Sequence, residues 1–279
     1  MQDLTSPTVI RQIMQKFAFS CRKGLGQNFL ADRNIVDKII QAAQLQPGET
    51  VLEIGPGLGV LTNALGQENP IWAIEKDQRL KTNLTQTRYT EVKLIWADAL
   101  EVDLAALLGS EKQVKIISNL PYYVTSPLVI RVLTSRLNWQ SMVIMVQREV
   151  AERLTAAPGS KEYGSLSVLV NYYAQSKFLF KVPRTVFIPQ PKVDSAVLIL
   201  ERRSRPAVEV TDPEFLFKIV RAAFGQRRKT LLNALAGTFP DWEKFRLAEQ
   251  IEQAGIKPDC RGETLSLEQF AALSKQIQK

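Results

Sequence analysis

The sequence contains no histidine in its 279 residues. This absence excludes Ser-His and Cys-His nucleophilic chemistry, and it excludes every histidine-ligated metal site. It also removes the one side chain that ordinarily titrates near neutral pH. Any catalysis by this chain must therefore proceed without such a group.

Cysteine and long apolar runs are scarce as well. Cys21 and Cys260 lie far apart with no CxxC spacing, so we predict neither a disulfide framework nor a metal site. No stretch approaches the roughly 18 apolar residues of a membrane span. The first 20 residues also lack the features of a secretory signal. We therefore expect a soluble, cytoplasmic protein without a membrane partner, although a plastid stroma would suit the sequence equally.

Negative charge is under-represented, and the excess of positive charge is uneven. The chain has 36 basic and 28 acidic residues, for a net charge of +8. Residues 1–30 hold four basic residues against one acidic, and residues 201–279 hold fourteen against eleven. Basic ends around a nearly neutral middle fit a polyanion that is bound at the periphery. A basic protein that is merely soluble is the alternative interpretation.

Apolar, β-branched runs alternate with stretches of helical pattern in the first two thirds of the chain. Continuous apolar strands that alternate with amphipathic helices are typical of a parallel sheet covered on both faces. Two later runs, "SKFLFKV" and "AVLILERR", predict closing strands, which could pair antiparallel at the sheet edge. The predicted parallel strands are residues 50–55, 71–75, 93–97, 114–118 and 142–147.

The composition changes after about residue 203. "RSRPAVEVTDP" is a polar linker that contains proline, and the sequence beyond it has helical patterns only. We therefore divide the chain into an N-terminal extension (1–20), an α/β domain (21–203) and a small all-helical domain (204–279).

Two helix starts in this last part have clear signatures. Asp212 is a candidate N-cap, and Pro213 follows it at the first helical position. Ser266 stands three residues before Gln269, which is the spacing of a capping box.

The first predicted strand ends in a glycine cluster. "VLEIGPGLG" places Gly55, Gly57 and Gly59 where a backbone can turn sharply and approach a ligand. Glu75 ends the next strand, where a carboxylate can accept both hydroxyls of a ribose. Asp98 follows the third strand and could accept from an adenine amino group. A nicotinamide dehydrogenase shares the first two elements, but the spacing is GxGxG rather than GxGxxG.

The fourth strand ends in "NLPYY", which resembles the motif of methyltransferases that act on exocyclic amino groups of bases. The Asn119 side-chain oxygen and a backbone carbonyl near Leu120 could accept both hydrogens of an adenine amine and make its nitrogen more nucleophilic. Pro121 fixes the turn and has no N–H to compete for those acceptors. Tyr122 offers a stacking face for the base. Tyr123 could also stack, but packing beneath the turn is the favoured interpretation.

Further motifs extend this resemblance to most of the chain. In order, they are "GQNFL", "EIGPGLG", "NLPYY", "VFIPQPKVDS", "AFGQRRKTLLNAL" and "RGETLSLEQFAAL". Together they are similar to the ribosomal RNA adenine dimethyltransferases of the small-subunit (KsgA) type. This resemblance implies a Rossmann-like class I methyltransferase domain followed by a helical, RNA-binding domain. It also implies S-adenosylmethionine as cofactor and dimethylation of two adjacent adenines in the 3′-terminal hairpin loop of 16S-type ribosomal RNA.

The resemblance also implies roles for individual residues. The implied cofactor-binding positions are Asn28, Leu30, Gly55, Gly57, Glu75, Asp98 and Asn119. The implied catalytic positions are Asn119, Leu120, Pro121 and Tyr122, and Tyr122 and Phe187 are implied to stack on the target base. We expect Arg22, Lys23, Arg227, Arg228 and Lys229 to contact RNA, with a solvated or structural role as the alternative.

Two other functions compete with this one. A 23S ribosomal RNA methyltransferase of the macrolide-resistance type shares the cofactor features, and a methyltransferase-fold transcription factor would bind nucleic acid without catalysis. "NLPYY" together with "FGQRRKTL" favours the small-subunit enzyme. We expect it to act on small-subunit RNA within a 30S-type assembly particle and to be a monomer.

Overall fold

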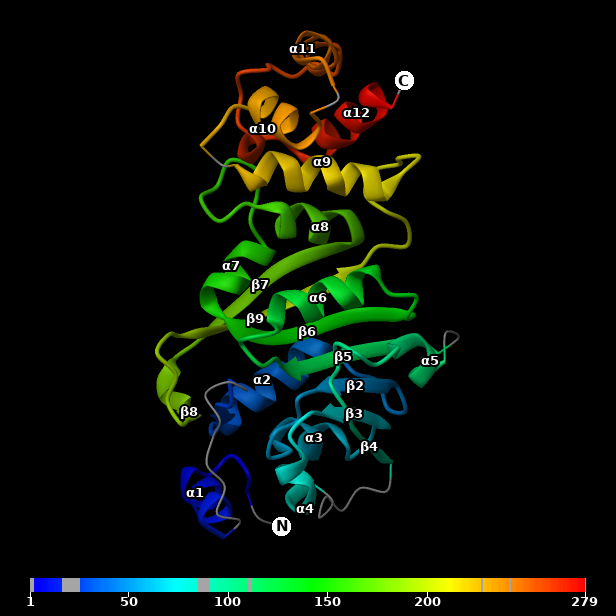
Figure 1. Cartoon of the computed structure of the whole chain (residues 1–279). Coiled ribbons are helices and arrows are strands. Elements are labelled where there is room, and N and C mark those ends of the chain that lie inside the picture. The colour runs from blue at the N-terminus through cyan, green and yellow to red at the C-terminus, as the bar shows by residue number, and fades with distance from the viewer. Residues whose placement is uncertain are drawn as a thin grey trace. The chain divides into compact units, whose positions relative to one another are not determined.

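The protein is described by a computed structural model, shown in Figure 1. It describes residues 3–16, 26–84, 91–109, 112–226, 228–240 and 242–278. The chain separates into two compact units, Met1–Ala151 with Lys177–Arg202 and Glu152–Ser176 with Arg203–Lys279. The predicted change of character near residue 203 lies beside this division. Glu152–Ser176, which the linear division assigns to the α/β domain, groups with the second unit.

The first unit is built on a seven-stranded sheet with the strand order β4-β3-β2-β5-β6-β9-β7. The strands are β2 (Thr50–Ile54), β3 (Ile71–Glu75), β4 (Val92–Trp96), β5 (Val114–Asn119), β6 (Trp139–Gln147), β7 (Ala174–Val182) and β9 (Ser195–Arg202). Strands β2 to β6 pair in parallel, and β9 runs antiparallel to β6. The predicted strands are therefore present, and the predicted α/β class is confirmed.

Strand β2 lies inside this sheet, with β3 on one side and β5 on the other. The chain moves outward in one direction from β2 to β4 and in the other from β5 onward. Ligands of open α/β sheets bind in the crevice that such a reversal leaves at the carboxyl ends of the strands. The order of strands therefore places a candidate crevice after Ile54 and Asn119.

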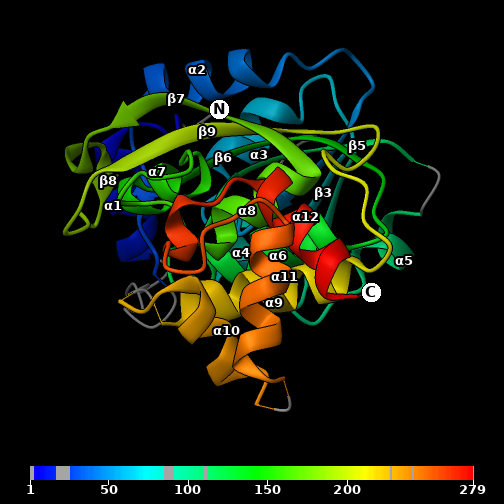
Figure 2. The same cartoon turned by 90° about the horizontal axis from the view of Figure 1, so that it is seen from above.

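Helices cover both faces of the sheet, and Figures 1 and 2 show α2 and α6 on opposite sides of it. Helix α2 (Arg33–Ala43) precedes β2, and the helical elements after the strands are α3 (Val60–Leu65), η2 (Gln78–Leu80), α4 (Lys81–Leu84), α5 (Leu104–Leu108), α6 (Thr125–Thr134) and α7 (Arg148–Leu154). The side chain of Asp32 caps α2 by accepting from the Ile35 backbone N–H at 3.0 Å.

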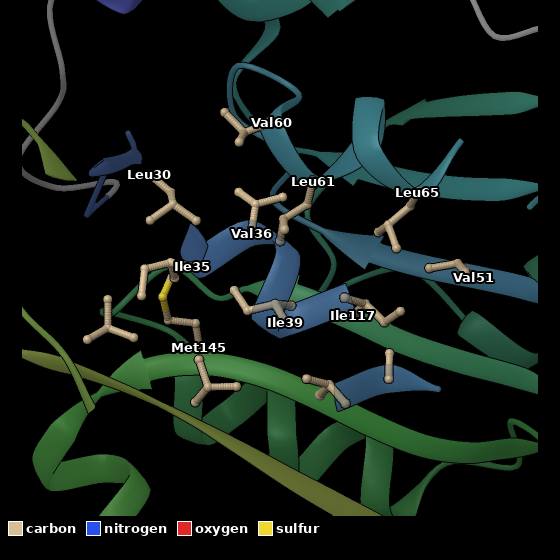
Figure 3. Close-up of a cluster of buried hydrophobic side chains, with 14 of the residues drawn as sticks. Leu30, Ile35, Val36, Ile39, Val51, Val60, Leu61, Leu65, Ile117 and Met145 are labelled. Carbon is tan, nitrogen blue, oxygen red and sulfur yellow. The ribbon is translucent and has the colours of Figure 1, made fainter. Parts of the chain in front are cut away.

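The core of this unit lies between α2, α3 and the sheet, as Figure 3 shows. Helix α2 buries apolar residues at the spacing of one helical face. Ile39 is 1% exposed at the centre of that face. The principal members of the cluster are Leu30, Ile35, Val36, Ile39, Val51, Val60, Leu61, Leu65, Ile117 and Met145.

A second, short sheet joins two distant segments. Strand β1 (Phe29–Leu30), from "GQNFL", pairs antiparallel with β8 (Phe187–Ile188), from "VFIPQP". A short helix, η3 (Arg184–Val186), precedes β8, and the Val186 carbonyl accepts from the Ala31 N–H at 2.7 Å. This pairing holds the "GQNFL" segment against the rest of the unit.

The predicted N-terminal extension contains a helix that the sequence reasoning did not anticipate. Helix α1 (Pro7–Lys16) begins with proline at its first position, where the missing N–H costs nothing. Ile10 and Ile13 are buried in a small cluster with Phe29 and Leu58. The described part of the extension is therefore folded onto the first unit.

The second unit is helical. Its helices are α8 (Ser165–Tyr173), α9 (Pro213–Gly225), α10 (Leu231–Thr238), α11 (Lys244–Gln253), η4 (Gly262–Thr264) and α12 (Leu267–Ile277). Both predicted caps are confirmed. Asp212 accepts from the Phe215 N–H at 3.0 Å, and Ser266 and Gln269 form a reciprocal capping box. No helix in the described ranges of the chain combines the length and apolar character needed to span a membrane.

Replacing Ile39 tests the core. We expect Ile39→Ala to lower the free energy of unfolding by about 2–5 kcal/mol, because it leaves a cavity between α2 and the sheet. Urea unfolding followed by circular dichroism measures the change. Gln41→Ala on the exposed face of the same helix is the control and should stay within about 0.5 kcal/mol. Equal effects of the two substitutions would contradict the described packing.

Candidate active site

The crevice at the carboxyl ends of the strands is a pocket with ≈ 950 Å³ of empty space, part of it open to solvent. The pocket is lined by every predicted cofactor position: Asn28, Leu30, Gly55, Gly57, Glu75, Asp98 and Asn119. Leu120, Pro121, Tyr122 and Tyr123 also line it. The structure thus brings together residues that lie on five separate segments of the sequence.

The glycine loop after β2 requires glycine at two positions. Gly55 has φ +74°, and a Cβ there would lie 3.2 Å from the Pro121 side chain. Gly57 has φ +60°, and a Cβ there would lie 3.1 Å from the Phe29 ring. L-residues with side chains rarely adopt such backbone angles, and both neighbours are already in close contact. The loop can therefore approach "NLPYY" on one side and "GQNFL" on the other.

Glu75 connects the end of β3 with the glycine loop. Its Oε2 accepts from the Gly57 N–H at 3.1 Å, and its Oε1 accepts from the Asp77 N–H at 2.7 Å. Burial raises the pKa of the Glu75 carboxyl, and these backbone donors only partly offset the effect. Each oxygen keeps a further lone pair, so the carboxylate can still accept from hydroxyl groups in the pocket.

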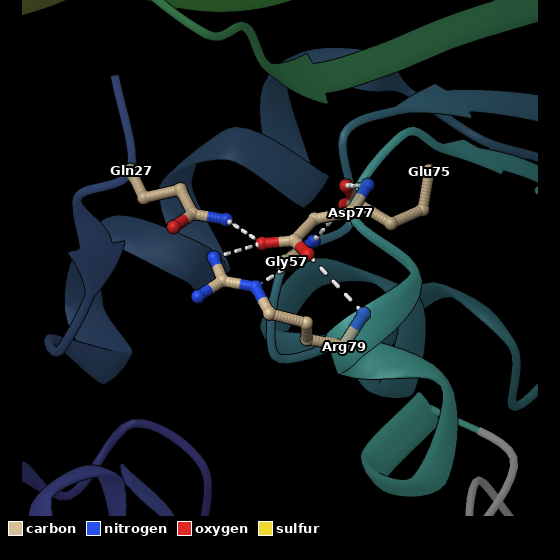
Figure 4. A network of polar contacts seen from close by, with 5 residues as sticks. All are labelled: Gln27, Gly57, Glu75, Asp77 and Arg79. Carbon is tan, nitrogen blue, oxygen red and sulfur yellow. Dashed lines mark hydrogen bonds and ion pairs between the residues drawn. The ribbon is translucent and has the colours of Figure 1, made fainter. Parts of the chain in front are cut away.

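Asp77 is the centre of a polar network beside the pocket, shown in Figure 4. Its carboxylate accepts from Gln27 Nε2 at 2.8 Å and from Arg79 Nη2 at 2.5 Å. Burial acts to raise the pKa of Asp77, but the hydrogen bonds from Arg79 and Gln27 outweigh it and lower the pKa. Because Asp77 also donates its backbone N–H to Glu75, the network ties the "GQNFL" segment to the end of β3.

Asp98 follows β4 and forms an ion pair on the pocket wall. Its Oδ2 lies 2.6 Å from Lys76 Nζ, and its Oδ1 accepts from the Leu100 N–H at 2.9 Å. The hydrogen bond from Lys76 is the main reason that the pKa of Asp98 is lowered. Asp98 is therefore an ionised acceptor, and Lys76 lines the same pocket.

Asn119 ends β5 with its side chain oriented by a hydrogen bond. Its Nδ2 donates to the Asn28 carbonyl at 3.3 Å. Since a carbonyl can only accept, this contact identifies the amide nitrogen and leaves Oδ1 as the opposite atom. In the described part of the chain, neither Asn119 Oδ1 nor the Leu120 carbonyl oxygen receives a hydrogen bond. Both atoms belong to residues that line the pocket.

The two tyrosines of the turn differ in their surroundings. The Tyr122 hydroxyl lies 2.6 Å from the buried Ser195 Oγ, and burial raises the pKa of this phenol. Tyr123 is 45% exposed and lines the pocket. The favoured interpretation, that Tyr123 packs beneath the turn, is therefore wrong.

Phe187 lies in the apolar core instead of in the pocket. Its ring is 2% exposed in the apolar core, at the β8 position opposite Leu30, and the residue is not on the pocket wall. A stacking role would require the ring to leave that core, so this role stays a prediction.

Comparison with known proteins gives this site its context. A family model described as "Ribosomal RNA adenine dimethylase" matches residues 18–279. The chain belongs to the ribosomal RNA adenine dimethylase family. A relative from Pelotomaculum thermopropionicum, named "Ribosomal RNA small subunit methyltransferase A", is 50% identical over 97% of this chain and 96% of its own length. A relative of the same name from Anoxybacillus flavithermus is 45% identical over 99% of this chain and 97% of its own length.

Two solved structures of related enzymes share the fold. A dimethyladenosine transferase from Plasmodium falciparum has a TM-score of 0.72 at 25% identity, covering 88% of this chain and 95% of its own. The 23S rRNA methyltransferase ErmE has a TM-score of 0.67 at 26% identity, covering 90% of this chain and all of its own. The expected Rossmann-like methyltransferase fold is confirmed, and the small-subunit relatives are much more similar in sequence than ErmE is. The alternatives considered from the sequence are not favoured.

The predicted RNA-contacting residues of this dimethylase-family chain are only partly described. Arg228 and Lys229 are exposed in the turn between α9 and α10 of the second unit. Arg22, Lys23 and Arg227 lie outside the described residues. The contact of all five with RNA stays a prediction.

Sequence reasoning missed several residues that shape the pocket. Asp77 and Gln27 form the network, Lys76 pairs with Asp98, and Ser195 anchors Tyr122. Gln27 and Ser195 stand inside motifs shared with the dimethylase family, "GQNFL" and "PKVDS", and this was the one available signal. Their partners are 50 and 73 residues away, which no local pattern reveals.

Replacing Asp77 tests the network. We expect Asp77→Asn to lower the free energy of unfolding at pH 7 by about 1–3 kcal/mol, because a buried, charge-assisted hydrogen bond is lost. The folded-state pKa of Asp77 lies below 3.8, so its contribution is complete above pH 3.8 and is lost as the pH falls through the folded pKa. Urea unfolding at pH 7 and pH 3 should show the difference from wild type shrinking at the lower pH.

The exposed ion pair between Arg33 and Asp37 supplies a matched control. Asp37→Asn should change stability by less than about 1 kcal/mol. An Asp77→Asn effect no larger than this control would contradict the network.

Proposed function

We propose that this protein transfers methyl groups from S-adenosylmethionine to the exocyclic amino groups of two adjacent adenines in the 3′-terminal hairpin loop of 16S-type small-subunit ribosomal RNA. Membership in the dimethylase family supports the reaction class. One observation carries the proposal: the turn Asn119–Tyr122, the glycine loop, and the acids Glu75 and Asp98 line one pocket.

The residues of the pocket fit the cofactor by their chemistry. Glu75 offers carboxylate oxygens for the two ribose hydroxyls, and Asp98 is an acceptor for the adenine amino group. Gly55 and Gly57 themselves place no side chain in the pocket, while Asn28, Leu30 and Asn119 border the same space. When bound, the cofactor supplies an electrophilic methyl group. Because Lys76 already contacts Asp98, a bound adenine would share this carboxylate with the lysine.

The target base needs two acceptors and a stacking face. Asn119 Oδ1 and the Leu120 carbonyl can accept the two amine hydrogens, which concentrates electron density on the adenine nitrogen. Pro121 offers no competing N–H, and its ring lies against the glycine loop. Tyr122 supplies a face for the base, which must leave its stack to be reached. In-line transfer then depends on positioning, and the product loses its proton to water, so no histidine is required.

Exposed basic side chains in the second unit support RNA as the substrate. We propose that the helical region after residue 203 binds RNA, with Arg228 and Lys229 neutralising phosphates together with Arg22, Lys23 and Arg227. The substrate would be a single-stranded loop within a 30S-type particle, recognised partly by RNA shape. We further propose a monomeric enzyme of the cytoplasm, with the plastid stroma as the organellar equivalent.

Methyl transfer to ribosomal particles tests this function. Purified protein is incubated with labelled S-adenosylmethionine and 30S particles from cells that lack this methylation, and primer extension locates the methyl groups. We expect label at two adjacent adenines near the 3′ end of the small-subunit RNA. Label confined to large-subunit RNA, or no transfer to either, would contradict the proposal.

Asn119→Ala is the matched variant for this assay. We expect its transfer rate to fall ~10²-fold or more, since the amine is no longer held for in-line attack. RNA binding measured by filter retention should stay near the wild-type value.

Replacing Tyr122 tests the stacking face. Tyr122→Ala should lower kcat/KM for RNA about 5- to 150-fold, which corresponds to a loss of about 1–3 kcal/mol of stacking. Tyr122→Phe keeps the ring and removes only the contact with Ser195, so its loss should be below about tenfold.

Ser195→Ala completes a double-mutant cycle with Tyr122→Phe. The two losses should not add, because both substitutions remove the same contact. If Tyr122→Phe were as impaired as Tyr122→Ala, the hydroxyl rather than the ring face would be the important part.

A further inference from the structure

A third acid on the pocket wall, Glu53, is more deeply buried than Glu75. Glu53, in β2, is 2% exposed and lines the pocket, and its Oε2 accepts from the Thr62 hydroxyl at 2.6 Å. In the described ranges, the fully enclosed side-chain atoms without a partner are Trp139 Nε1 and Ser274 Oγ. Glu53 Oε1 receives no hydrogen bond there and is not one of these atoms, so it is not fully enclosed, and its residue lines the pocket.

No cation in the described ranges pairs with Glu53, and Lys115 on the neighbouring strand β5 pairs with Glu49 instead. Helix α3, which carries Thr62, contains no titratable residue, and neither does the glycine loop. The nearest charge on β3 is Glu75, which has the same sign. The other titratable groups on the pocket wall are the ion-paired Lys76 and Asp98 and the phenols of Tyr122 and Tyr123.

This environment keeps the carboxyl neutral in the free protein. Burial raises the pKa of Glu53 to about 8; the Thr62 hydrogen bond opposes this rise and the charge of Glu75 adds to it. At neutral pH most molecules therefore hold a proton on Glu53. A cation that enters the pocket reverses the preference, because an opposite charge favours the ionised form.

The charge of the cofactor changes during the proposed reaction. S-Adenosylmethionine carries a sulfonium and an ammonium against one carboxylate, whereas S-adenosylhomocysteine has lost the sulfonium charge. We propose that Glu53 senses this charge: its carboxyl releases its proton to solvent when the cationic donor binds and regains one from solvent when the neutral product remains. The pocket thereby favours the donor over the spent product. This inference rests on the proposed function.

Proton release on binding is the direct test. Titration calorimetry at pH 7 in phosphate and in Tris, which differ in ionisation enthalpy, gives the number of protons released by the wild type and by Glu53→Gln. Subtracting the number of protons released with Glu53→Gln from the number released with the wild type cancels the protons that the ligand itself releases. We expect a difference of roughly 0.9 proton for S-adenosylmethionine, set by a free pKa near 8, and a much smaller one for S-adenosylhomocysteine.

The affinity for the donor should follow the same group. As the pH is raised towards 8, the affinity of the wild type for S-adenosylmethionine, relative to that of Glu53→Gln, should increase by up to ~10-fold per pH unit. Thr62→Val keeps the carboxyl and removes the donor that lowers its pKa, so the midpoint of proton release should move to higher pH. A merely structural role of either residue would not produce that shift.

The free protein gives a readout that does not depend on ligand. The folded pKa of Glu53 is above its unfolded value of 4.5, so its contribution to stability is complete below pH 4.5 and is lost as the pH rises through about 8. The Tm of Glu53→Gln minus the Tm of the wild type should therefore increase as the pH is raised from 5 to 9.

The outcomes separate the two proposals. If S-adenosylmethionine binds the wild type but releases no more protons than it does with Glu53→Gln, the charge-sensing role is overturned and the proposed function stands. Equal release with both ligands also overturns it. If the wild type does not bind S-adenosylmethionine at all, the proposed function itself fails. Should Glu53→Gln not fold, the midpoint shift in Thr62→Val decides the question.

Discussion

The contact between Gly55 and Pro121 is the constraint on which the site depends. It joins the turn after β2 to the turn after β5 at the place where the strand order reverses. A Cβ at Gly55 would lie 3.2 Å from the proline ring, so the two turns can approach this closely only because one residue has no side chain. Glu75 is bound to the first turn through the Gly57 N–H, and Asn119, Leu120 and Tyr122 belong to the second.

Hydrogen bonds then fix what the backbone brings together. The "GQNFL" segment has no long element of its own, and three separate interactions hold it: pairing with β8, the Gln27 contact with Asp77, and the Asn119 amide on the Asn28 carbonyl. Buried charges are costly unless they are paired, and Asp77 meets this requirement through Arg79. The same polar groups that stabilise the pocket therefore also determine its shape.

Much of this arrangement follows from the sequence, and the remainder has a common physical cause. The strands are continuous apolar runs, and the caps at Asp212 and Ser266 obey rules that involve only neighbouring residues, so both were predictable. Gly55, Glu75, Asp98 and Asn119 could be expected at one site because parallel strands end at one edge, whereas Asn28 and Leu30 were implied only by the resemblance to the family. Ser195, Asp77 and the exposure of Tyr123 depend on partners that are distant in sequence, which periodicity does not encode. Helix α1 was missed although Val9, Ile10 and Ile13 lie on one helical face, because residues 1–20 were treated as an extension.

The packing of helix α1 has a consequence for ligand binding. Phe29 and Leu58 belong to the cluster that buries Ile10 and Ile13, and both also line the pocket. The two side chains thus form a partition with α1 on one side and the ligand space on the other. Free energies coupled through a shared wall are reciprocal. A ligand that orders this partition strengthens the docking of α1, and the docked helix strengthens ligand binding by the same factor, although α1 contributes no residue to the pocket wall.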